Sequence, residues 1–569
     1  MIKKTIVSIL FFINFQSAIF AQFQYKKLLF IPWGNKSDQI KLREVNSGRI
    51  GPTSFSINGE NIFVLDFNKK QLKQFLKGQH KSNISIENPL HDVFFINKYG
   101  NPVFNTFQNF LVNKNISIKK EDNYTISIKG SGFDILFKDS LPIGFGQYLG
   151  KAANNNHYIY IENIIQHVPL IIERKILVVD QIGKVKIIFH YPNNNYTYIP
   201  QEFFVNDGDL FFLISRSEGV TVSGWIYNDQ IMDSLITYRL PEEMLKGQHY
   251  NFEFQNFEEP DSIIETDSDN ESFIYPPVSP GEALETADSY VSFNWTAENS
   301  NMTNGVQTDP QGVMIQTPEW IQLGDNYHVP YKWGGFNNLD EFSSGLSENK
   351  FAGDKITDCY QNYCVSNYCV GVDCSGFISR CWNLSTHYST AMMDDDITIL
   401  YDSWEDLNPG DAIHKVGHVR MVVFKNTDGS ILTVEASGYD WKVSYRSYNL
   451  SQLTAYSPRY YQGMEGTATS IPIPKLSSII KEDEIILNWG LSNSDGVSGF
   501  NIYRFSDNDN WILLNFLDTL VTSQSFIDQA SPVYFNLTSV SENEGVVEGF
   551  NSDSYGAFGD FQSKDILIV

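Results

Sequence analysis

Hydrophobic and polar positions alternate along most of residues 23 to 256, which is the pattern of half-buried β-strands. Residues 51 to 75, GPTSFSINGENIFVLDFNKKQLKQF, alternate around an Asn-Gly turn and end in a charged hairpin. The same order of strand, turn and strand returns in HDVFFINKYGNPVF (91 to 104), ERKILVVDQIGKVKIIFHYP (173 to 192) and EFFVNDGDLFFLISRSEGVTVSGW (202 to 225). These residues therefore predict an all-β domain without a long amphipathic helix.

The repeats recur at irregular intervals of about 40 residues, a spacing typical of propeller blades. The first copy, residues 51 to 75, resembles the blades of NHL-type propellers. We expect residues 23 to 256 to form a β-propeller-like domain of five or six blades. A plain β-sandwich, or a pair of small β domains, is the alternative.

Residues 257 to 278 are acidic and then proline-rich, which is the composition of an extended linker. Ser279 is a suitable N-cap and Pro280 a suitable first helical residue. Apolar residues follow at helical spacing and predict a helix over 280 to 296: Leu284, Ala287, Tyr290, Val291 and Trp295. A second domain is expected to run from 279 to 462.

After a linker at 463 to 473, short strand patterns return: EIILNW (484 to 489), GFNIYRF (499 to 505), WILLNF (511 to 516) and VYFNLTSVS (533 to 541). With Trp489 early, Tyr503 central and Tyr534 late, residues 474 to 553 resemble a fibronectin type III sandwich. Residues 554 to 569 end on the apolar DILIV, and we expect them to be a tail or the start of a further domain.

Residues 1 to 22 combine a basic start, a short apolar run and small residues near a possible cleavage point, so they predict a secretory signal peptide. The protein is expected to be exported to the periplasm, the cell surface or the medium. No cysteine lies near the cleavage point, which argues against a lipoprotein anchor, and no later run is apolar enough to predict a transmembrane segment.

The formal charge is −26, or −28 once the two lysines of the signal peptide are removed, and this excess of acidic residues argues against nucleic acid as a partner. All five cysteines lie between 359 and 381. If Cys374 is set aside, Cys359, Cys364, Cys369 and Cys381 could form two disulfides in an oxidising compartment. Their C-x4-C spacing lacks the C-x2-C pairs of zinc sites, so we expect neither a metal nor another cofactor.

Cys374 stands in VDCSGFISRCW (372 to 382), where a turn is expected to enter a helix. A thiol at a helix N-terminus faces free backbone N–H groups and the positive end of the helix dipole, which favours the thiolate. The alternative is a buried structural cysteine. A nucleophilic cysteine needs a base, and a third group to orient that base.

GDAIHKVGHVRMVVF (410 to 424) supplies the base, with His418 opening an alternating strand. A second strand, ILTVEASG (431 to 438), follows a polar turn. A loop at 425 to 428 would place Glu435 directly opposite His418, and a tighter turn would place it opposite Val422; both keep Glu435 on the face of His418. His414 is a competing base, but Gly417 is expected to break the strand and leave His414 at the rim.

Four motifs follow one another in this part of the chain: YKWGG (331 to 335), DCSGF (373 to 377), Gly410-Asp411 with His418-Val419, and VEAS (434 to 437). In the order and rough spacing of these motifs, residues 280 to 461 resemble the NlpC/p-sixty cell-wall cysteine peptidases. This resemblance implies an α+β papain-like fold, with Cys374 as nucleophile and His418 as general base. It implies that Tyr331 lines the site near the oxyanion, with Trp333, Asp373 and Ser375 in the same region.

Two features depart from the family pattern. Glu435 stands where the third residue is often histidine, and Arg420 stands where the family often has a small residue. An insertion with three of the cysteines separates YKWGG from DCSGF. A carboxylate can orient an imidazole, so the exchange at 435 is chemically sound.

The sequence thus predicts a multidomain hydrolase that cleaves amide bonds. The resemblance implies that its substrate is a peptidoglycan stem peptide, typically cut at a γ-D-glutamyl linkage to a diamino acid. Its partners would be peptidoglycan or muropeptides. The alternatives are an amidase at the sugar–peptide junction, an acyl or amide transferase, or a surface adhesion protein with an inactive central domain.

Overall fold

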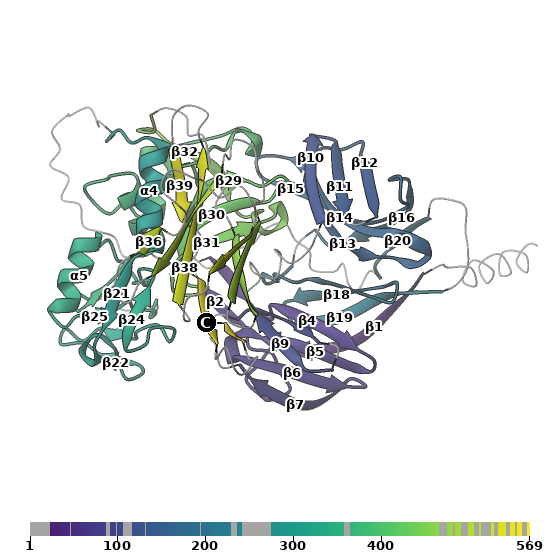
Figure 1. Ribbon diagram of the computed structural model, residues 1–569, viewed down its shortest axis with the longest axis horizontal. Helices are drawn as coiled ribbons and strands as arrows, with labels where there is room; N and C mark the ends of the chain where they lie inside the picture. The colour runs from purple at the N-terminus through teal and green to yellow at the C-terminus, as the bar shows by residue number, and fades with distance from the viewer. Residues whose placement is uncertain are drawn as a thin grey trace, which may run out of the picture.

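The computed structural model describes residues 23 to 465, apart from 46, 87–90, 98, 106–115, 131, 194, 229–235, 242–274 and 358–364, together with strands between 475 and 568. The protein is rich in β-structure and folds into several separate sheets (Figure 1). Among the described residues no helix has the length and apolar character needed to span a bilayer. The expected signal peptide lies outside the described part of the chain.

The described residues between 23 and 241 form four larger sheets and two pairs of strands. The orders are β1-β19-β18-β17, β4-β5-β6-β7, β10-β11-β12 and β13-β14-β15-β16-β20, with the pairs β2-β3 and β8-β9. Their bounds are β1 (Phe23–Pro32), β2 (Arg43–Val45), β3 (Gly48–Ile50), β4 (Ser54–Asn58), β5 (Asn61–Asp66), β6 (Gln71–Leu76), β7 (Gln79–Ser85), β8 (Val93–Ile96), β9 (Pro102–Asn105), β10 (Ile116–Asp122), β11 (Thr125–Gly130), β12 (Phe133–Lys138), β13 (Ile143–Lys151), β14 (His157–Gln166), β15 (Ile171–Val179), β16 (Val185–Tyr191), β17 (Phe203–Asn206), β18 (Asp209–Arg216), β19 (Gly219–Tyr227) and β20 (Ile236–Arg239).

Each of the four predicted segments forms strands, because each alternates around a turn that its residues can make. In the first, Asn58 pairs with Asn61 across a turn in which Gly59 has a φ of 58°, a conformation that favours glycine. The first strands of successive sheets are neighbours: β4 lies beside β8 and β17, and β13 lies beside β17. The first strand of the domain, β1, pairs with β19, one of its last.

The central residues form an antiparallel sheet in the order β27-β32-β28-β29-β30-β31. Its strands are β27 (Thr398–Leu400), β28 (Ala412–Lys415), β29 (His418–Lys425), β30 (Ile431–Ser437), β31 (Lys442–Tyr448) and β32 (Ser457–Tyr461). The helices α4 (Pro280–Val291) and α6 (Cys374–Cys381) pack on each other and on this sheet. Smaller elements complete the region: α5 (Leu339–Ser347), α7 (Thr390–Met392), β21 (Asn294–Ala297), β22 (Gln307–Thr308), β23 (Met314–Ile315), β24 (Gly324–Tyr327), β25 (Phe351–Ala352) and β26 (Cys369–Val370).

Helix α4 begins as predicted but ends earlier. Ser279 accepts a hydrogen bond from the Glu282 N–H, and Glu282 accepts one from the Ser279 N–H, which closes a capping box. The helix ends at Val291 rather than at 296, because Trp295 belongs to β21, which pairs with β24. The apolar spacing of Trp295 thus reflects a strand packed on the same core.

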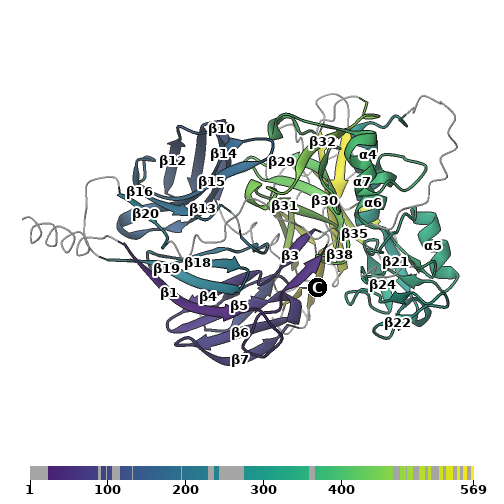
Figure 2. The same cartoon turned by 180° about the vertical axis from the view of Figure 1, so that it is seen from behind.

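The N-terminal sheets lie beside the central sheet (Figures 1 and 2), and residues of both regions share buried clusters. Val45, Ile50 and Phe67 belong to the cluster that contains α4 and α6. A second cluster joins Ile164, Leu170 and Ile172 to Ile413 and Val422. The N-terminal region therefore covers part of the central domain.

The C-terminal strands form two sheets, β33-β34-β37 and β36-β35-β38-β40-β41, with β39 paired to β38. Their bounds are β33 (Lys475–Lys481), β34 (Glu484–Gly490), β35 (Gly499–Phe505), β36 (Trp511–Leu513), β37 (Ser525–Asp528), β38 (Val533–Ser541), β39 (Val547–Asn551), β40 (Tyr555–Gly559) and β41 (Ile566–Ile568). The expectation that residues 554 to 569 are a separate tail is wrong for β40 and β41, because β40 pairs with β38 and β41 with β40.

Candidate active site

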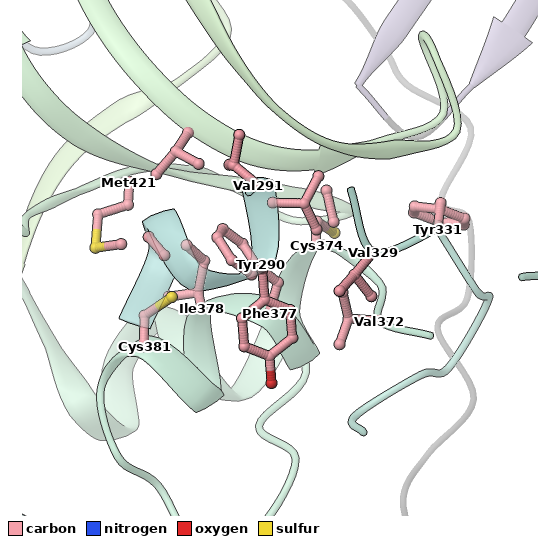
Figure 3. Packing of buried hydrophobic residues seen from close by; sticks show 14 of the residues in the cluster. Tyr290, Val291, Val329, Tyr331, Val372, Cys374, Phe377, Ile378, Cys381 and Met421 are labelled. Atoms are coloured by element: carbon pink, nitrogen blue, oxygen red, sulfur yellow. The ribbon is translucent and has the colours of Figure 1, made fainter. Parts of the chain in front are cut away.

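Helix α6 places Cys374 at its first residue, as the sequence predicts. The Asp373 side chain caps the helix by accepting a hydrogen bond from the Gly376 N–H at 2.7 Å. Figure 3 shows Cys374 and Cys381 among buried hydrophobic side chains that include Phe377 and Ile378. Cys374 is 1% exposed, so its sulfur faces the interior.

The segments YKWGG and DCSGF contact each other through their backbones. The Lys332 N–H donates to the Val372 carbonyl at 2.9 Å, and the Asp373 N–H donates to the Gly335 carbonyl at 3.0 Å. A Cβ atom at Gly376 would lie 1.9 Å from the Gly335 oxygen, so only glycine fits there. This contact explains why YKWGG and DCSGF occur together: each supplies a glycine to one close backbone approach.

Both registers considered for the β29–β30 hairpin are wrong. Met421 pairs with Val434 and Val422 with Thr433, and a bulge follows between Val422 and Phe424. Continued in this register, Glu435 lies opposite Arg420, between the two predicted positions. Glu435 nevertheless lies on the same face of the sheet as His418, as predicted, because strand side chains alternate and His418 lies two residues from Arg420.

His418 and Glu435 meet in the interior. His418 Nε2 lies 2.5 Å from Glu435 Oε2, and both side chains are fully buried. His418 Nδ1 has no hydrogen-bond partner within the described residues. A carboxylate can only accept, so the bond to Glu435 places the proton on Nε2 and leaves the lone pair of Nδ1 available to a thiol.

Glu435 is held by further cations and a phenol. Arg420 Nε lies 3.3 Å from Oε2, Arg446 Nε lies 3.6 Å from Oε1, and the Tyr448 hydroxyl donates to Oε1. Burial alone would favour the neutral acid, but Arg420, His418 and Arg446 outweigh it and hold the pKa of Glu435 well below its usual range. Glu435 is therefore ionised at neutral pH.

Burial lowers the pKa of the histidine, whereas it acts to raise that of the carboxyl group. It lowers the pKa of His418 to about 4, against the hydrogen bond and the charge of Glu435, which raise it. His418 is therefore neutral at pH 7, which is the state required of a general base.

Helix α6 packs against β29 and β30, the strands that carry His418 and Glu435. Lys415 pairs directly opposite His418, and the Tyr456 ring lies 6.3 Å from the His418 ring. Burial lowers the pKa of Lys415 to about 7 and raises that of Tyr456.

His414 is a structural histidine. Its Nε2 bonds to the Thr390 carbonyl at 2.7 Å, and Nδ1 lies 3.6 Å from Asp394. Gly417, with a φ of 88°, breaks the strand as predicted. The predicted rim position is wrong, because His414 is buried on the other strand of the hairpin, opposite Val419.

Asp373 and Ser375 form a second polar cluster with a residue that the sequence did not reveal. Ser375 Oγ lies 2.9 Å from His387 Nε2 and 3.1 Å from Asp373 Oδ1, and His387 Nε2 lies 3.3 Å from Asp373. Burial opposes ionisation of Asp373, but His387 and the Gly376 N–H hold its pKa below the ordinary value. The His387 ring stacks on Phe336.

Tyr331 and Trp333 are both buried in the cluster that contains Cys374. The Tyr331 backbone lies beside Val372, two residues before Cys374, and its ring packs edge-on against Trp441 at 5.3 Å. The Trp333 N–H donates to the Asp354 carbonyl at 3.2 Å. The Tyr331 backbone therefore lies beside the segment that leads into α6, whereas the Trp333 backbone is hydrogen-bonded to Asp354.

The predicted pair of disulfides is not formed, because Cys369 and Cys381 are free and buried. Cys359 and Cys364 lie outside the described residues. Burial raises the pKa of Cys369 to about 12 and that of Cys381 well above its usual range, so both are inert thiols. Within the described ranges no group of three His, Cys, Asp or Glu could hold a metal ion.

Arg446 and Tyr448 could have been found from the sequence. The strand after VEAS reads KVSYRSY, and its alternate residues at 442, 444, 446 and 448 share one face. Glu435 pairs with Ser444, which places Arg446 and Tyr448 on the face of the carboxylate. His387 carried no such signal, because it lies beyond α6 outside any strand or helix.

No protein-family model matches the chain, and no curated protein matches it. Among solved structures, the spore cortex lytic enzyme SleM of Clostridium perfringens is 14% identical over 17% of this chain and 33% of its own length, with a TM-score of 0.11. Streptogramin B lyase is 12% identical over 35% of this chain and 72% of its own, with a TM-score of 0.12. The extracellular domain of BT4673 from B. thetaiotaomicron is 8% identical over 91% of this chain and 70% of its own, with a TM-score of 0.14.

This chain thus spans a third of the length of SleM. Likenesses at these TM-scores carry no inference about fold or function.

Proposed function

We propose that this protein is an exported cysteine hydrolase that cleaves amide bonds in peptidoglycan stem peptides. The observation that supports it best is the buried pair of His418 and Glu435, in which Nε2 is bonded to the carboxylate and Nδ1 is left without a partner among the described residues. The strand that begins at His418 packs against the helix that begins at Cys374. A nucleophile, a base and an orienting group are the set that acyl transfer from an amide requires.

In the proposed mechanism, His418 Nδ1 takes the proton of the Cys374 thiol and the thiolate attacks the amide carbonyl. Backbone N–H groups at the start of α6 stabilise the oxyanion. The C–N bond then breaks, and Nδ1 returns the proton to the departing amine. Water, activated by the same nitrogen, hydrolyses the thioester and restores the thiol.

The domain assignments belong to the same proposal. Residues 279 to 462 would be a papain-like domain of the NlpC/p-sixty type, supported by the order of the motifs and by the shared backbone contact of Gly335 and Gly376. The contacts of β4 with β8 and β17, and of β13 with β17, together with the pairing of β1 with β19, support a propeller for the N-terminal region. Two antiparallel sheets support a fibronectin type III-like module at the C-terminal end.

The substrate is proposed from the family resemblance as a γ-D-glutamyl linkage to a diamino acid. An amidase at the sugar–peptide junction is the nearest alternative, because it needs the same catalytic set. An inactive adhesion protein is disfavoured, since decayed enzymes tend to lose one of the catalytic residues and this chain keeps Cys374, His418 and Glu435.

The test is to incubate the chain from residue 23 onward with purified muropeptides and to identify new termini by mass spectrometry. We expect release of fragments that begin with the diamino acid, and complete loss of cleavage in Cys374→Ala. Cys381→Ala, a change in the same helix, is the matched control and should retain activity. Free sugar chains would instead indicate an amidase, and an inert wild type would refute the proposal.

A further inference from the structure

Tyr456 lies between β31 and β32, and its hydroxyl makes two hydrogen bonds. It accepts one from Arg420 Nη2 at 2.9 Å and donates one to the Ser47 carbonyl at 2.9 Å. A guanidinium can only donate and a carbonyl can only accept, so the direction of both bonds is fixed. The Tyr456 side chain is buried. Its hydroxyl therefore connects an arginine of β29 to the N-terminal region.

The Arg420 end of this connection leads to the catalytic base. Arg420 Nε lies 3.3 Å from Glu435 Oε2, the oxygen that also faces His418 Nε2. A guanidinium is planar and rigid, so a hydrogen bond at Nη2 also sets the direction of Nε. The position of the Tyr456 hydroxyl thus determines how Arg420 faces the carboxylate that orients the imidazole.

The Tyr456 ring contacts the same groups. Its centroid lies 4.4 Å from the centre of the Arg420 guanidinium and 6.3 Å from the centroid of the His418 ring, to which it is nearly perpendicular. The centroid of the Tyr448 ring lies 4.1 Å from the guanidinium. Aromatic rings attract a cation to their faces but leave it free to turn in its own plane. The hydrogen bond to the Tyr456 hydroxyl removes that freedom.

Ser47 holds the other end of the connection. It lies between β2 and β3, and its hydroxyl accepts a hydrogen bond at 3.3 Å from Ser437, which belongs to the strand of Glu435. Ser47, Arg420 and Tyr456 all line a cavity of about 120 Å³ between the N-terminal sheets and the central sheet. A side chain beside a cavity has fewer packing contacts than one in a filled core. The two hydrogen bonds therefore contribute more to the position of the Tyr456 hydroxyl.

These contacts also account for Arg420, which stands where the NlpC/p-sixty family often has a small residue. A buried arginine is tolerated when its charge and its donors are paired. Glu435 supplies the opposite charge, and the Tyr456 hydroxyl accepts from one of the donors. The exchange at 420 is thus accompanied by partners that place the guanidinium beside the catalytic pair.

We propose that Tyr456 is a positioning residue for the catalytic base. Anchored on the Ser47 carbonyl, its hydroxyl holds the Arg420 guanidinium in one orientation. Arg420 in turn fixes the Glu435 carboxylate, which orients His418. The inference rests on the proposed function, because it assigns a role within the same site, and it makes the N-terminal region a part of that site.

The first test does not require activity. The chain from residue 23 onward is prepared with isotope-labelled histidine, and the proton on His418 Nε2 is followed by NMR; its signal is identified by its absence in His418→Gln. His418 and Glu435 are fully buried, which protects this proton from exchange with water. We expect a signal far downfield in the wild type, as for a short bond to a carboxylate. In Tyr456→Phe the signal should shift upfield, because the carboxylate is no longer held in one place.

Tyr461→Phe is the matched control. Tyr461 is also buried, and its hydroxyl also donates to a main-chain carbonyl, that of Pro276, at 2.9 Å, but its ring stacks on Trp382. The His418 signal should stay in place in this variant. An unmoved signal in Tyr456→Phe, or an equal shift in Tyr461→Phe, would overturn the proposal.

The second test measures muropeptide cleavage, and only this arm depends on the proposed activity. Tyr456→Phe should lower kcat about tenfold, the effect of one hydrogen bond to a charged group. KM should not change, because both partners of the hydroxyl are protein groups, and Tyr461→Phe should change neither constant. A rise in KM alone would assign Tyr456 to substrate binding and overturn the proposal. An inactive wild type would refute the proposed hydrolase, and the NMR signal would still decide whether Tyr456 positions the His418–Glu435 pair.

Discussion

Glu435 shows how a single buried residue can be kept charged. Four side chains contact its two oxygens: His418 and Arg420 at Oε2, and Arg446 and Tyr448 at Oε1. A buried carboxylate is tolerated only when it is paired in this way. The same contacts fix the plane of the carboxylate and therefore the orientation of the imidazole.

We expect Glu435→Gln to lower kcat/KM for muropeptides by roughly 10⁴-fold, the loss seen when the orienting carboxylate of a triad becomes an amide. The amide can present its NH2 group to Nε2, which would leave the wrong nitrogen protonated, and two arginines lose their counter-charge. Glu405→Gln, a change at a side chain that is 41% exposed, should leave kcat/KM unchanged. An unaltered rate in Glu435→Gln would show that Glu435 does not orient the base.

The depressed pKa values at this site predict acid sensitivity. His418 has a pKa of about 4 in the folded protein and about 6.5 when unfolded, so the unfolded chain binds the extra proton as the pH falls through this window. The pKa of Glu435 is also lowered, and its stabilising charge is likewise lost on acidification. Both effects reduce stability at low pH.

Urea denaturation between pH 7 and pH 4 should show a loss of about 3 kcal/mol in the free energy of unfolding from His418 alone. His418→Gln removes this titration, so its stability should depend less steeply on pH over the same range. If the free energy of unfolding fell equally steeply with pH in the wild type and in His418→Gln, the low pKa of His418 would be contradicted.

At the scale of elements, the start of α6 is positioned by the segment that contains YKWGG. The Gly335 carbonyl accepts the Asp373 N–H and lies against the Cα of Gly376. This docking sets where the first turn of the helix, and with it Cys374, meets the central sheet. The helix dipole can then act on the thiol at a fixed place.

Gly376→Ala should therefore damage both stability and activity, because its Cβ would lie 1.9 Å from the Gly335 oxygen. We expect a loss of about 1 to 3 kcal/mol, the usual cost of overpacking, in thermal or urea unfolding. Gly281→Ala in the first turn of α4 is the matched control, since its Cβ would meet nothing closer than 3.9 Å. That control should be neutral or slightly stabilising, and equal losses in both variants would refute the docking argument.

At the scale of the whole molecule, the N-terminal region is part of the core around the site. Val45, Ile50 and Phe67 are buried with Cys374 and Tyr331 in one cluster, and the Arg43 guanidinium donates to the Tyr439 carbonyl at 2.9 Å. The Tyr456 hydroxyl donates to the Ser47 carbonyl at 2.9 Å. Separation of the two regions would expose these apolar and polar groups together.

We therefore expect residues 279 to 462, expressed alone, to melt at a lower temperature than the same residues within the full chain, and to aggregate through the exposed face. Differential scanning calorimetry and light scattering measure both effects. A fragment that matches the full chain in melting temperature would show that the shared clusters contribute nothing to its stability.

The sequence by itself determined the local features of this protein. Side-chain period and turn residues, which act between near neighbours in the chain, decide such features. Among them are the strand segments, the N-cap at Ser279, the helix start at Cys374 and the common face of His418 and Glu435. The hairpin register could not be predicted, because a bulge between Val422 and Phe424 shifts it by one residue: the pairs next to the turn would place Glu435 opposite Met421, and the bulge places it opposite Arg420.

Only the tertiary structure decided the long-range features. Four features depend on segments that are far apart in the chain: the buried position of His414, the contact of His387 with Ser375, the free thiols of Cys369 and Cys381, and the cavity at Arg420. No local pattern encodes such contacts, because each is selected by the packing of complete sheets and helices. The physical reason is that period and propensity act within an element, whereas burial and charge pairing act between elements.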